Sequence, residues 1–415
     1  MHLRHPVLWL PLVAASSTLL PASSGDDELW SQAELESVSE EIKEQIAQLR
    51  GQAFKHGVRV EIQDKDGLIA YMKKRQDEFE PEADRKATER LAKLFGMVPQ
   101  DLDLDATLQS VIEQQVGGFY DPADDAFFLM ESFTGDLARL ILAHELVHAL
   151  DDQWYDLDGT IESLLGSTDA LEAYRSVIEG SATYAMQAWM MKHAMGLDRE
   201  ALMESNDMLS GGLDDAPAFL WKPLISAYMQ GMLFLADGDK RDVDSFIELA
   251  FKAPPRSMEQ VLHPEKYWDE GKRDEPRTVQ VEFEEPGDWK VVHEDTYGEL
   301  YLALMTAPAD QRGGLDASNP MAFLTLKYTN DAASGWDGDR VVLLENGDTH
   351  AAMLVTVWDS PEDSTEFATA LKGVFSELED DVQRSVEVAF GDVVVVKVVA
   401  GEGELPQSIH KIAGE

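Results

Sequence analysis

The stretch Ala143-His144-Glu145-Leu146-Val147-His148-Ala149 places two imidazoles four residues apart, with a carboxylate beside the first. It lies within DLARLILAHELVHAL, residues 136–150, which contains no Gly or Pro and consists mostly of strong helix formers. At about 100° per residue, His144 and His148 share one face of this helix while leucines occupy the opposite face. The helix is therefore apolar nearly all round and is predicted to be buried. Two buried imidazoles need partners for their ring nitrogens, and this spacing is typical of a zinc site.

A second long helix is predicted over residues 169–195, because a D-x-x-E capping pattern begins at Asp169 and Gly196 follows its last residue. Glu179 lies in this helix, 31 positions after His148, which leaves room for the helix to return antiparallel to the first. Gly180 costs about 1 kcal/mol relative to Ala in a helix, and a close approach of the two helices at a metal would justify that cost. A helical Glu is usually solvated, so Glu179 is a ligand candidate only because HExxH precedes it.

Three segments of the chain resemble a known family: LAHELVHALDDQ (142–153), IEG (178–180) and APPRSMEQVLHPEKY (253–267). They resemble the gluzincins, zinc proteases in which HExxH is followed by a Glu ligand on a later helix. More narrowly, they are similar to a group of largely uncharacterised secreted bacterial and archaeal metalloprotease-like proteins. The resemblance runs from about residue 111 to about residue 399. It implies a zincin-like domain in which His144, His148 and Glu179 hold one zinc ion and Glu145 is the general base.

The expected chemistry follows from that ligand set. A zinc ion with three protein ligands lowers the pKa of a bound water from near 16 to about 7, and Glu145 would take the proton and pass it to a leaving amine. Peptide hydrolysis fits this arrangement best. Gluzincins often carry an Asp four residues after the Glu ligand, where it supports the first His, whereas this chain has Thr183. The resemblance therefore leaves open which group orients His144.

A β-hairpin is predicted before the first helix, because QQVGGFYDPADDAFFLM (114–130) reads as two apolar runs around an Asp121–Asp125 turn. By analogy with zincins, one of its strands would lie along the active-site cleft and pair with an extended peptide. An ordinary structural hairpin is the alternative, and the sequence does not separate the two interpretations.

A developing oxyanion usually receives a hydrogen-bond donor besides the metal. Four side chains are candidates for this role or for substrate contact: Tyr120, Tyr184, His263 and Tyr267. Packing or a structural hydrogen bond is the more common role for each of them.

The N-terminus has the pattern of a signal peptide. Residues 1–24 carry Arg4, an apolar run from residue 7 to 20, and small residues at Ala22 and Ser24. We therefore expect an exported protein that is periplasmic, at the cell surface or extracellular, without membrane insertion after the signal is removed. The chain has no Cys, which excludes disulfides and thiolate ligands and leaves His and carboxylate as the metal ligands.

The net charge of −45 disfavours nucleic acid as a partner. The partner that we expect from the hydrolytic chemistry is a peptide or protein substrate. Acidic clusters such as Glu282–Glu285 and Asp121–Asp125 could bind calcium. Neither matches a D-x-[DN]-x-[DN]-G loop, so zinc is the cofactor that the sequence favours.

The expected fold class is α+β, with a mainly helical zincin-like domain and a small edge hairpin, followed by a smaller antiparallel α+β module. The predicted order is a signal peptide (1–24), a helical region with one strand-turn-helix that packs on the protease core (25–110), the catalytic domain (111–290), the module (291–400) and a polar tail (401–415). In the module, apolar β-branched runs flank a helix capped by Ser360, and Asn346-Gly347 marks a turn. The GWDGD segment at 335–339 is either a ligand loop or a tight turn anchored by Trp336.

Two other functions use the same residues. The chain could be a catalytically silent surface or envelope protein that keeps a zincin fold for binding, and the intact HExxH motif and Glu179 argue against this. It could also be a zinc hydrolase that acts on a non-peptide amide or ester. Cleavage specificity, endo- or exopeptidase action and oligomeric state are not encoded in any pattern that we recognise.

Overall fold

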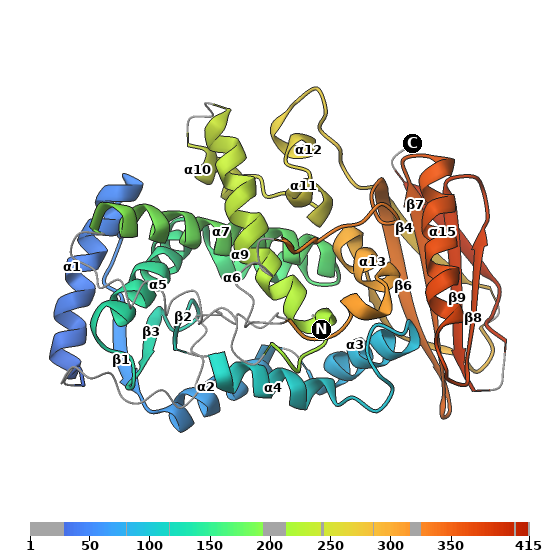
Figure 1. Ribbon diagram of the computed structural model, residues 1–415, viewed down its shortest axis with the longest axis horizontal. Helices are drawn as coiled ribbons and strands as arrows, with labels where there is room; N and C mark the ends of the chain where they lie inside the picture. The colour runs from blue at the N-terminus through green and yellow to red at the C-terminus, as the bar shows by residue number, and fades with distance from the viewer. Residues whose placement is uncertain are drawn as a thin grey trace.

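The computed structural model describes residues 29–79, 81–115, 117–193, 213–241, 245–284, 286–315, 325–401 and 404–413. The predicted signal peptide (1–24), Gly196 and part of the Glu282–Glu285 cluster lie outside these residues. The described chain has a mixed α+β fold, which confirms the expected class. Helices form one side of the molecule and an antiparallel sheet the other (Figure 1). Within the described residues, no helix is both long enough and apolar enough to cross a membrane.

The N-terminal and central part is mainly helical and includes a small sheet. Its helices are α1 (Gln32–Arg50), α2 (Lys65–Phe79), α3 (Glu82–Leu94), α4 (Leu104–Gln115), α5 (Gly135–Tyr155), α6 (Leu157–Leu164), α7 (Thr168–His193), α9 (Ala218–Lys240), α10 (Phe246–Lys252), α11 (Met258–Leu262) and α12 (Glu265–Trp268). Its strands are β1 (Arg59–Gln63), β2 (Gly118–Asp121) and β3 (Ala126–Met130). The sheet order is β1-β3-β2, with β1 parallel to β3 and β2 antiparallel to it. The predicted hairpin is therefore present, and β2 is an edge strand.

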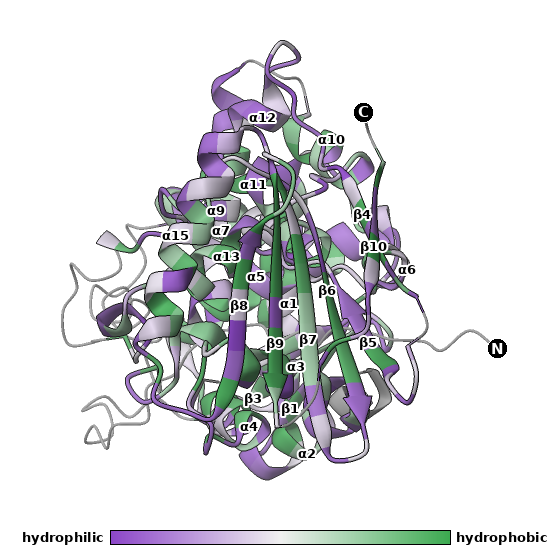
Figure 2. Cartoon of the chain, turned by 90° about the vertical axis from the view of Figure 1, so that its right-hand side faces the viewer, coloured by the Kyte–Doolittle hydropathy of each residue, from purple (hydrophilic) through white to green (hydrophobic). Residues whose placement is uncertain are grey.

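The C-terminal part is an antiparallel sheet with helices on one face. Its elements are β4 (Thr278–Phe283), β5 (Lys290–Asp295), α13 (Gly298–Thr306), β6 (Trp336–Asn346), β7 (Thr349–Trp358), α15 (Pro361–Ser376), β8 (Val382–Val388), β9 (Val393–Ala400) and β10 (Ser408–Ala413), with a 3₁₀ turn at Ala309–Gln311. The main sheet has the order β5-β6-β7-β9-β8. Strand β9 is mostly hydrophobic, whereas the edge strand β8 is largely hydrophilic (Figure 2). This difference fits β9's place in the interior of the sheet and β8's place at its edge.

Two features of this part differ from the expectations. Residues 408–413, in the stretch expected to be a polar tail, form β10, which pairs antiparallel with β4. Ile412 packs with Val279 of β4 against the face of the sheet opposite the helices, so burial of a few apolar side chains outweighs the polarity of the segment. In addition, α3 packs on the C-terminal sheet through Ala87, Leu91 and Ala92, whereas we expected the whole of 25–110 to pack on the protease core.

The GWDGD segment is anchored by its tryptophan. Trp336 is fully buried, and its indole N–H donates to Asp339 Oδ2 at 2.9 Å. Asp339 also accepts hydrogen bonds from the backbone N–H groups of Tyr297 and Gly298, at 2.8 and 2.7 Å, where α13 begins. The tryptophan is an anchor as expected, but residues 336–339 are the bulged start of β6 rather than a tight turn, and these contacts link β6 to α13.

Gly180 allows two helix backbones to touch, but the partner helix differs from the expected one. A Cβ added to Gly180 would lie 2.4 Å from the carbonyl carbon of Gly231 on α9, and one added to Gly231 would lie 1.9 Å from the carbonyl oxygen of Ser176 on α7. The close approach is therefore between α7 and α9, rather than between α7 and α5. Because α9 is about 50 residues further along the chain, no local pattern could identify it.

Replacing Gly180 with Ala should destabilise the protein by at least about 1 to 3 kcal/mol, because the new methyl group would overlap backbone atoms that cannot move aside. The free energy of unfolding in urea measures this effect. Gly373 in α15 is the matched control, since a Cβ there would meet nothing within 4 Å. Gly373→Ala should raise stability by up to about 1 kcal/mol. Equal effects of the two changes would contradict the close contact.

Candidate metal centre

The two histidines lie on consecutive turns of α5, which is buried over nearly two-thirds of its length. Their rings are nearly perpendicular, at 85°, with centroids 4.7 Å apart. The helical spacing brings His144 Nε2 and His148 Nε2 to 3.1 Å from each other. Both side chains are buried, so the pair is held in one place by packing on all sides.

Glu179 on α7 completes a triangle of possible ligand atoms. Its Oε2 lies 3.2 Å from His144 Nε2 and 3.4 Å from His148 Nε2. Ligands that surround an ion tetrahedrally at about 2.0 to 2.1 Å are about 3.3 to 3.4 Å from each other. The triangle therefore has the size that a tetrahedral zinc ion needs, and the donors are the imidazoles and carboxylate that zinc accepts.

Two of the three groups, Glu179 and His144, have pKa shifts that suit metal ligands. Burial opposes the charge of Glu179, yet the neighbouring His148 and His144 hold its pKa well below the usual range, so it is a carboxylate. Burial lowers the pKa of His144, which favours the neutral ring that a metal ligand must be. Burial also acts on His148, but Glu179 raises its pKa above the ordinary value. The Glu179 carboxylate therefore interacts with both imidazole rings.

Glu145 is fully buried beside this triangle and is held by the hairpin. Its Oε2 accepts a hydrogen bond from the backbone N–H of Tyr120 on β2 at 2.8 Å. Its Oε1 is buried and has no hydrogen-bond partner among the described residues. Burial raises the pKa of Glu145 to about 8. A buried carboxylate with one fixed oxygen and one open oxygen is suited to accept a proton from a water molecule.

Tyr228 of α9 packs on the candidate metal ligands, although no motif in the sequence points to it. Its ring stacks on that of His144, with centroids 5.8 Å apart and an interplanar angle of 24°. The Gly180–Gly231 contact places Tyr228 there, since it lies one turn before Gly231 on α9. An aromatic residue 84 positions after His144 carries no local signal of this role.

Thr183 stands at the position where gluzincins often carry a supporting Asp. It does not hydrogen-bond to either histidine. Its hydroxyl is buried and has no hydrogen-bond partner within the part of the chain that the structure describes. The stacking of Tyr228 is one contact that restricts the orientation of the His144 ring, besides those with Glu179 and His148.

A buried polar network connects the two ligand-bearing helices to α1. Arg50 Nη2 lies 2.7 Å from Asp151 Oδ1, and Arg50 Nη1 lies 3.0 Å from Ser181 Oγ. Ser181 donates to Asp151 Oδ2 at 2.6 Å. Asp151 is three residues after His148 and Ser181 is two residues after Glu179. The network therefore fixes the separation of α5 and α7 next to the candidate ligands.

Replacing Arg50 with Met should destabilise the protein by about 3 to 5 kcal/mol, because Asp151 would remain buried without a counter-charge. Chemical denaturation measures the loss. Arg139→Met is the matched control, since Arg139 forms a more exposed pair with Glu41 at 3.3 Å and should contribute less than about 1 kcal/mol. Equal, small losses in both variants would show that the network is not important for stability.

Two of the four candidate oxyanion donors hydrogen-bond elsewhere. The hydroxyl of Tyr120 bonds to Asp125 Oδ1 and Asp152 Oδ2, both at 2.9 Å. Tyr120 contacts the centre through its backbone N–H, which donates to Glu145. The hydroxyl of Tyr184 donates to Asp239 Oδ2 at 3.0 Å. Neither hydroxyl is directed at the triangle of ligand atoms.

The other two candidates also have structural partners. His263 Nε2 lies 3.0 Å from Glu299 Oε1 on α13, and this carboxylate raises the pKa of the imidazole. The hydroxyl of Tyr267 donates to the carbonyl oxygen of Ala253 at 2.6 Å. The first contact connects the 253–268 segment to α13, the second lies within the segment, and neither side chain bonds to Glu145.

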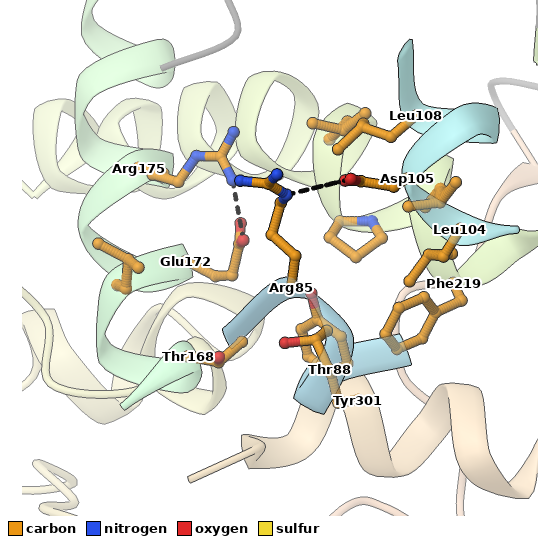
Figure 3. A pocket seen from close by; sticks show the side chains of 14 residues that line it. Arg85, Thr88, Leu104, Asp105, Leu108, Thr168, Glu172, Arg175, Phe219 and Tyr301 are labelled. Carbon is orange, nitrogen blue, oxygen red and sulfur yellow. Dashed lines mark hydrogen bonds and ion pairs between the residues drawn. The ribbon is translucent and has the colours of Figure 1, made fainter. Parts of the chain in front are cut away.

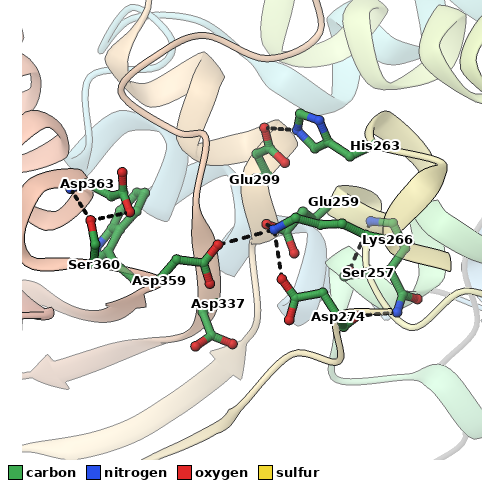
Figure 4. Close-up of polar contacts among 12 residues, drawn as sticks. Ser257, Glu259, His263, Lys266, Asp274, Glu299, Asp337, Asp359, Ser360 and Asp363 are labelled. Atoms are coloured by element: carbon green, nitrogen blue, oxygen red, sulfur yellow. Dashed lines mark hydrogen bonds and ion pairs between the residues drawn. The ribbon is translucent and has the colours of Figure 1, made fainter. Parts of the chain in front are cut away.

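One further group of described residues has the geometry to hold a cation: Glu259, Asp274 and Asp359. Lys266 already lies among them, and its ammonium group is 2.6, 2.8 and 3.3 Å from their oxygens (Figure 4). The lysine supplies the positive charge that a metal would otherwise provide. This cluster links α11 and the following loop to the end of β7.

The clusters considered for calcium also have protein partners in the structure. Asp121 pairs with Arg75 at 2.9 Å, and Asp125 with His56 at 2.9 Å. Glu282 pairs with Lys411 of β10 at 2.5 Å. Neither cluster is among the described groups with metal-binding geometry.

Comparison with known proteins assigns no activity to the chain. A family model described as a domain of unknown function, DUF8575, matches residues 288–403, which include β5 to β9 and exclude the metal centre. No curated protein and no solved structure matches the chain.

Proposed function

We propose that this chain is an exported zinc-dependent peptidase in which His144, His148 and Glu179 hold one zinc ion and Glu145 is the general base. The observation that carries the proposal is the triangle of 3.1, 3.2 and 3.4 Å among their nitrogen and oxygen atoms. The buried, unpartnered Oε1 of Glu145 beside it is the second support. A structural zinc site is usually closed by a fourth protein ligand, whereas a three-ligand site retains a position for water or substrate.

Zinc bound by these three residues would supply Lewis acidity, which polarises the scissile carbonyl and makes water acidic enough to ionise near neutral pH. Glu145 accepts the proton of the attacking water on Oε1 and delivers it to the nitrogen of the leaving amine. The Tyr120 N–H fixes Oε2, so the carboxylate keeps one orientation through both transfers. Burial raises its pKa to about 8, and the positive charge of a bound zinc ion would lower it toward the range in which the group is ionised at neutral pH.

The hairpin suits a peptide substrate, because β2 is an edge strand directly beside the catalytic helix. The backbone of Met130 on β3 donates to the carbonyl of Gly117, so the backbone groups of Gly118 and Tyr120 point away from β3. The Tyr120 N–H is taken by Glu145, and strand addition would use the other outward groups of this strand, whose four residues are buried.

A digest of a peptide library by the exported, purified chain tests this function. Cleavage should occur, stop when a chelator removes the metal and return when zinc is added. The same protein is assayed with neutral amide and ester substrates. Cleavage of these substrates but not of peptides would overturn the peptide assignment. A zinc-loaded chain that hydrolyses neither class would overturn the enzymatic proposal and favour a binding protein.

A further inference from the structure

A cavity of about 190 Å³ lies among helices α3, α4, α7 and α9. Helix α7 contributes Glu172 and Arg175 to its wall, α3 contributes Arg85 and α4 contributes Asp105 (Figure 3). The remaining lining is mostly aliphatic and aromatic. The pocket therefore combines an apolar wall with two arginines, in a chain that has only 34 basic residues against 79 acidic ones.

Two helices lead from this pocket to the candidate ligands. Arg175 lies one helical turn before Glu179 on α7. Leu224, which also lines the pocket, lies one turn before Tyr228 on α9, and the Tyr228 ring stacks on His144. Along either helix, the pocket residue and the residue at the metal are about one turn apart, roughly 5 to 6 Å. A substrate at the metal could therefore extend into the pocket.

Each arginine has a carboxylate partner, and that of Arg175 leaves donors available. Arg175 Nη1 lies 2.9 Å from Glu172 Oε1, and no other hydrogen bond of Arg175 occurs within the described residues. Arg85 Nε lies 3.0 Å from Asp105 Oδ1. Both guanidinium groups extend into the middle of the pocket, between their partners (Figure 3). A guanidinium has five N–H donors in a planar fork that matches a carboxylate, so Arg175 can bind a second one.

The negative net charge of the chain does not oppose a local anion site. Exposed charges more than about 8 to 10 Å away are largely screened at physiological ionic strength, whereas a buried guanidinium at contact distance is screened much less. The side chain of Arg175 is only 15% exposed, so its attraction for an anion at contact distance is weakly screened.

We propose that this pocket binds a carboxylate of the peptide substrate, next to the scissile bond, through Arg175 and with Arg85 on the opposite side. The carboxylate belongs either to an acidic side chain or to the C-terminus of the peptide. The apolar wall packs against the methylene or methyl groups of the same residue. This inference rests on the proposed function, because it takes the substrate to be a peptide.

Equilibrium binding to the Glu145→Gln chain tests the pocket without requiring cleavage. The probes are dansylated, amidated heptapeptides of alanine with a single Glu or Gln at each position in turn. A second arm compares the all-alanine peptide bearing a free C-terminal carboxylate with its amide. Fluorescence anisotropy in the presence of zinc should show at least about tenfold tighter binding for one acidic peptide than for its neutral match. The arm that shows the preference identifies the source of the carboxylate.

The variants decide whether the pocket causes this preference. Glu172→Gln with Arg175→Gln removes the ion pair without leaving a buried charge and should abolish the preference. Arg175→Lys keeps the charge but loses the fork, and it should lose most of the preference even if the double variant fails to fold. Arg256→Gln, an exposed arginine outside the pocket, is the matched control and should change nothing.

The absence of any acidic preference in the parent chain, or its survival in the pocket variants, would overturn the proposal. A chain that cleaves peptides without such a preference would keep the proposed function and lose only the pocket assignment. A chain that binds acidic peptides through Arg175 but cleaves none would keep the pocket assignment and lose the proposed function.

Discussion

Glu145→Gln is expected to lower peptide hydrolysis by at least about 1,000-fold while the zinc content of the protein stays unchanged. The glutamine oxygen can still accept the hydrogen bond from the Tyr120 N–H, but its amide cannot take a proton from water. Glu145 is not one of the three residues of the triangle, so the metal should remain. Steady-state kinetics and metal analysis of the same preparation measure the two parts of this prediction.

The matched control is Glu131→Gln, an exposed glutamate at the end of β3 that should leave the kinetics unchanged. If Glu145→Gln kept more than about a tenth of the activity, another group would be the base, since a positioned general base contributes about 100- to 10,000-fold. If the variant lost both activity and zinc, Glu145 would be acting on the metal site itself.

Glu179→Ala is expected to weaken zinc binding by more than about 100-fold, because it removes one of three ligands and the only carboxylate among them. Activity should fall with metal occupancy, and any thermal stabilisation by added zinc should be lost with it. Competition with a chromophoric chelator measures the affinity.

Glu162→Ala on α6 is the control for this second prediction. Glu162 is exposed and lies outside the triangle, so zinc affinity should stay within about twofold of the parent. An unchanged affinity in Glu179→Ala would mean that the two histidines bind metal with some other third ligand. It would also separate this chain from the gluzincin pattern that it resembles.

The parts of the candidate site that the sequence predicts best are local. A helix over 136–150 follows from propensity and periodicity, and the structure has α5 over Gly135–Tyr155. Once that helix exists, the spacing of His144 and His148 requires their side chains to meet on one face. The second helix is predicted for the same reason, and α7 begins within one residue of the expected start.

The parts that could not be predicted depend on contacts between distant segments. Gly180 indicates a close helix contact, but only the tertiary structure shows that the partner is Gly231 and that Tyr228 therefore stacks on His144. Likewise, β10 pairs with β4, which lies far earlier in the chain, so the short sequence of β10 does not indicate its partner. Arg85 and Arg175 are 90 positions apart, so their shared pocket has no signature in either segment.

Crystals of the zinc-loaded protein, measured on both sides of the zinc absorption edge, would show whether the three residues bind zinc. We expect one anomalous peak per chain, about 2.0 to 2.2 Å from His144 Nε2, His148 Nε2 and a carboxylate oxygen of Glu179. No peak at that position, or a peak only at the Glu259, Asp274 and Asp359 cluster, would contradict it.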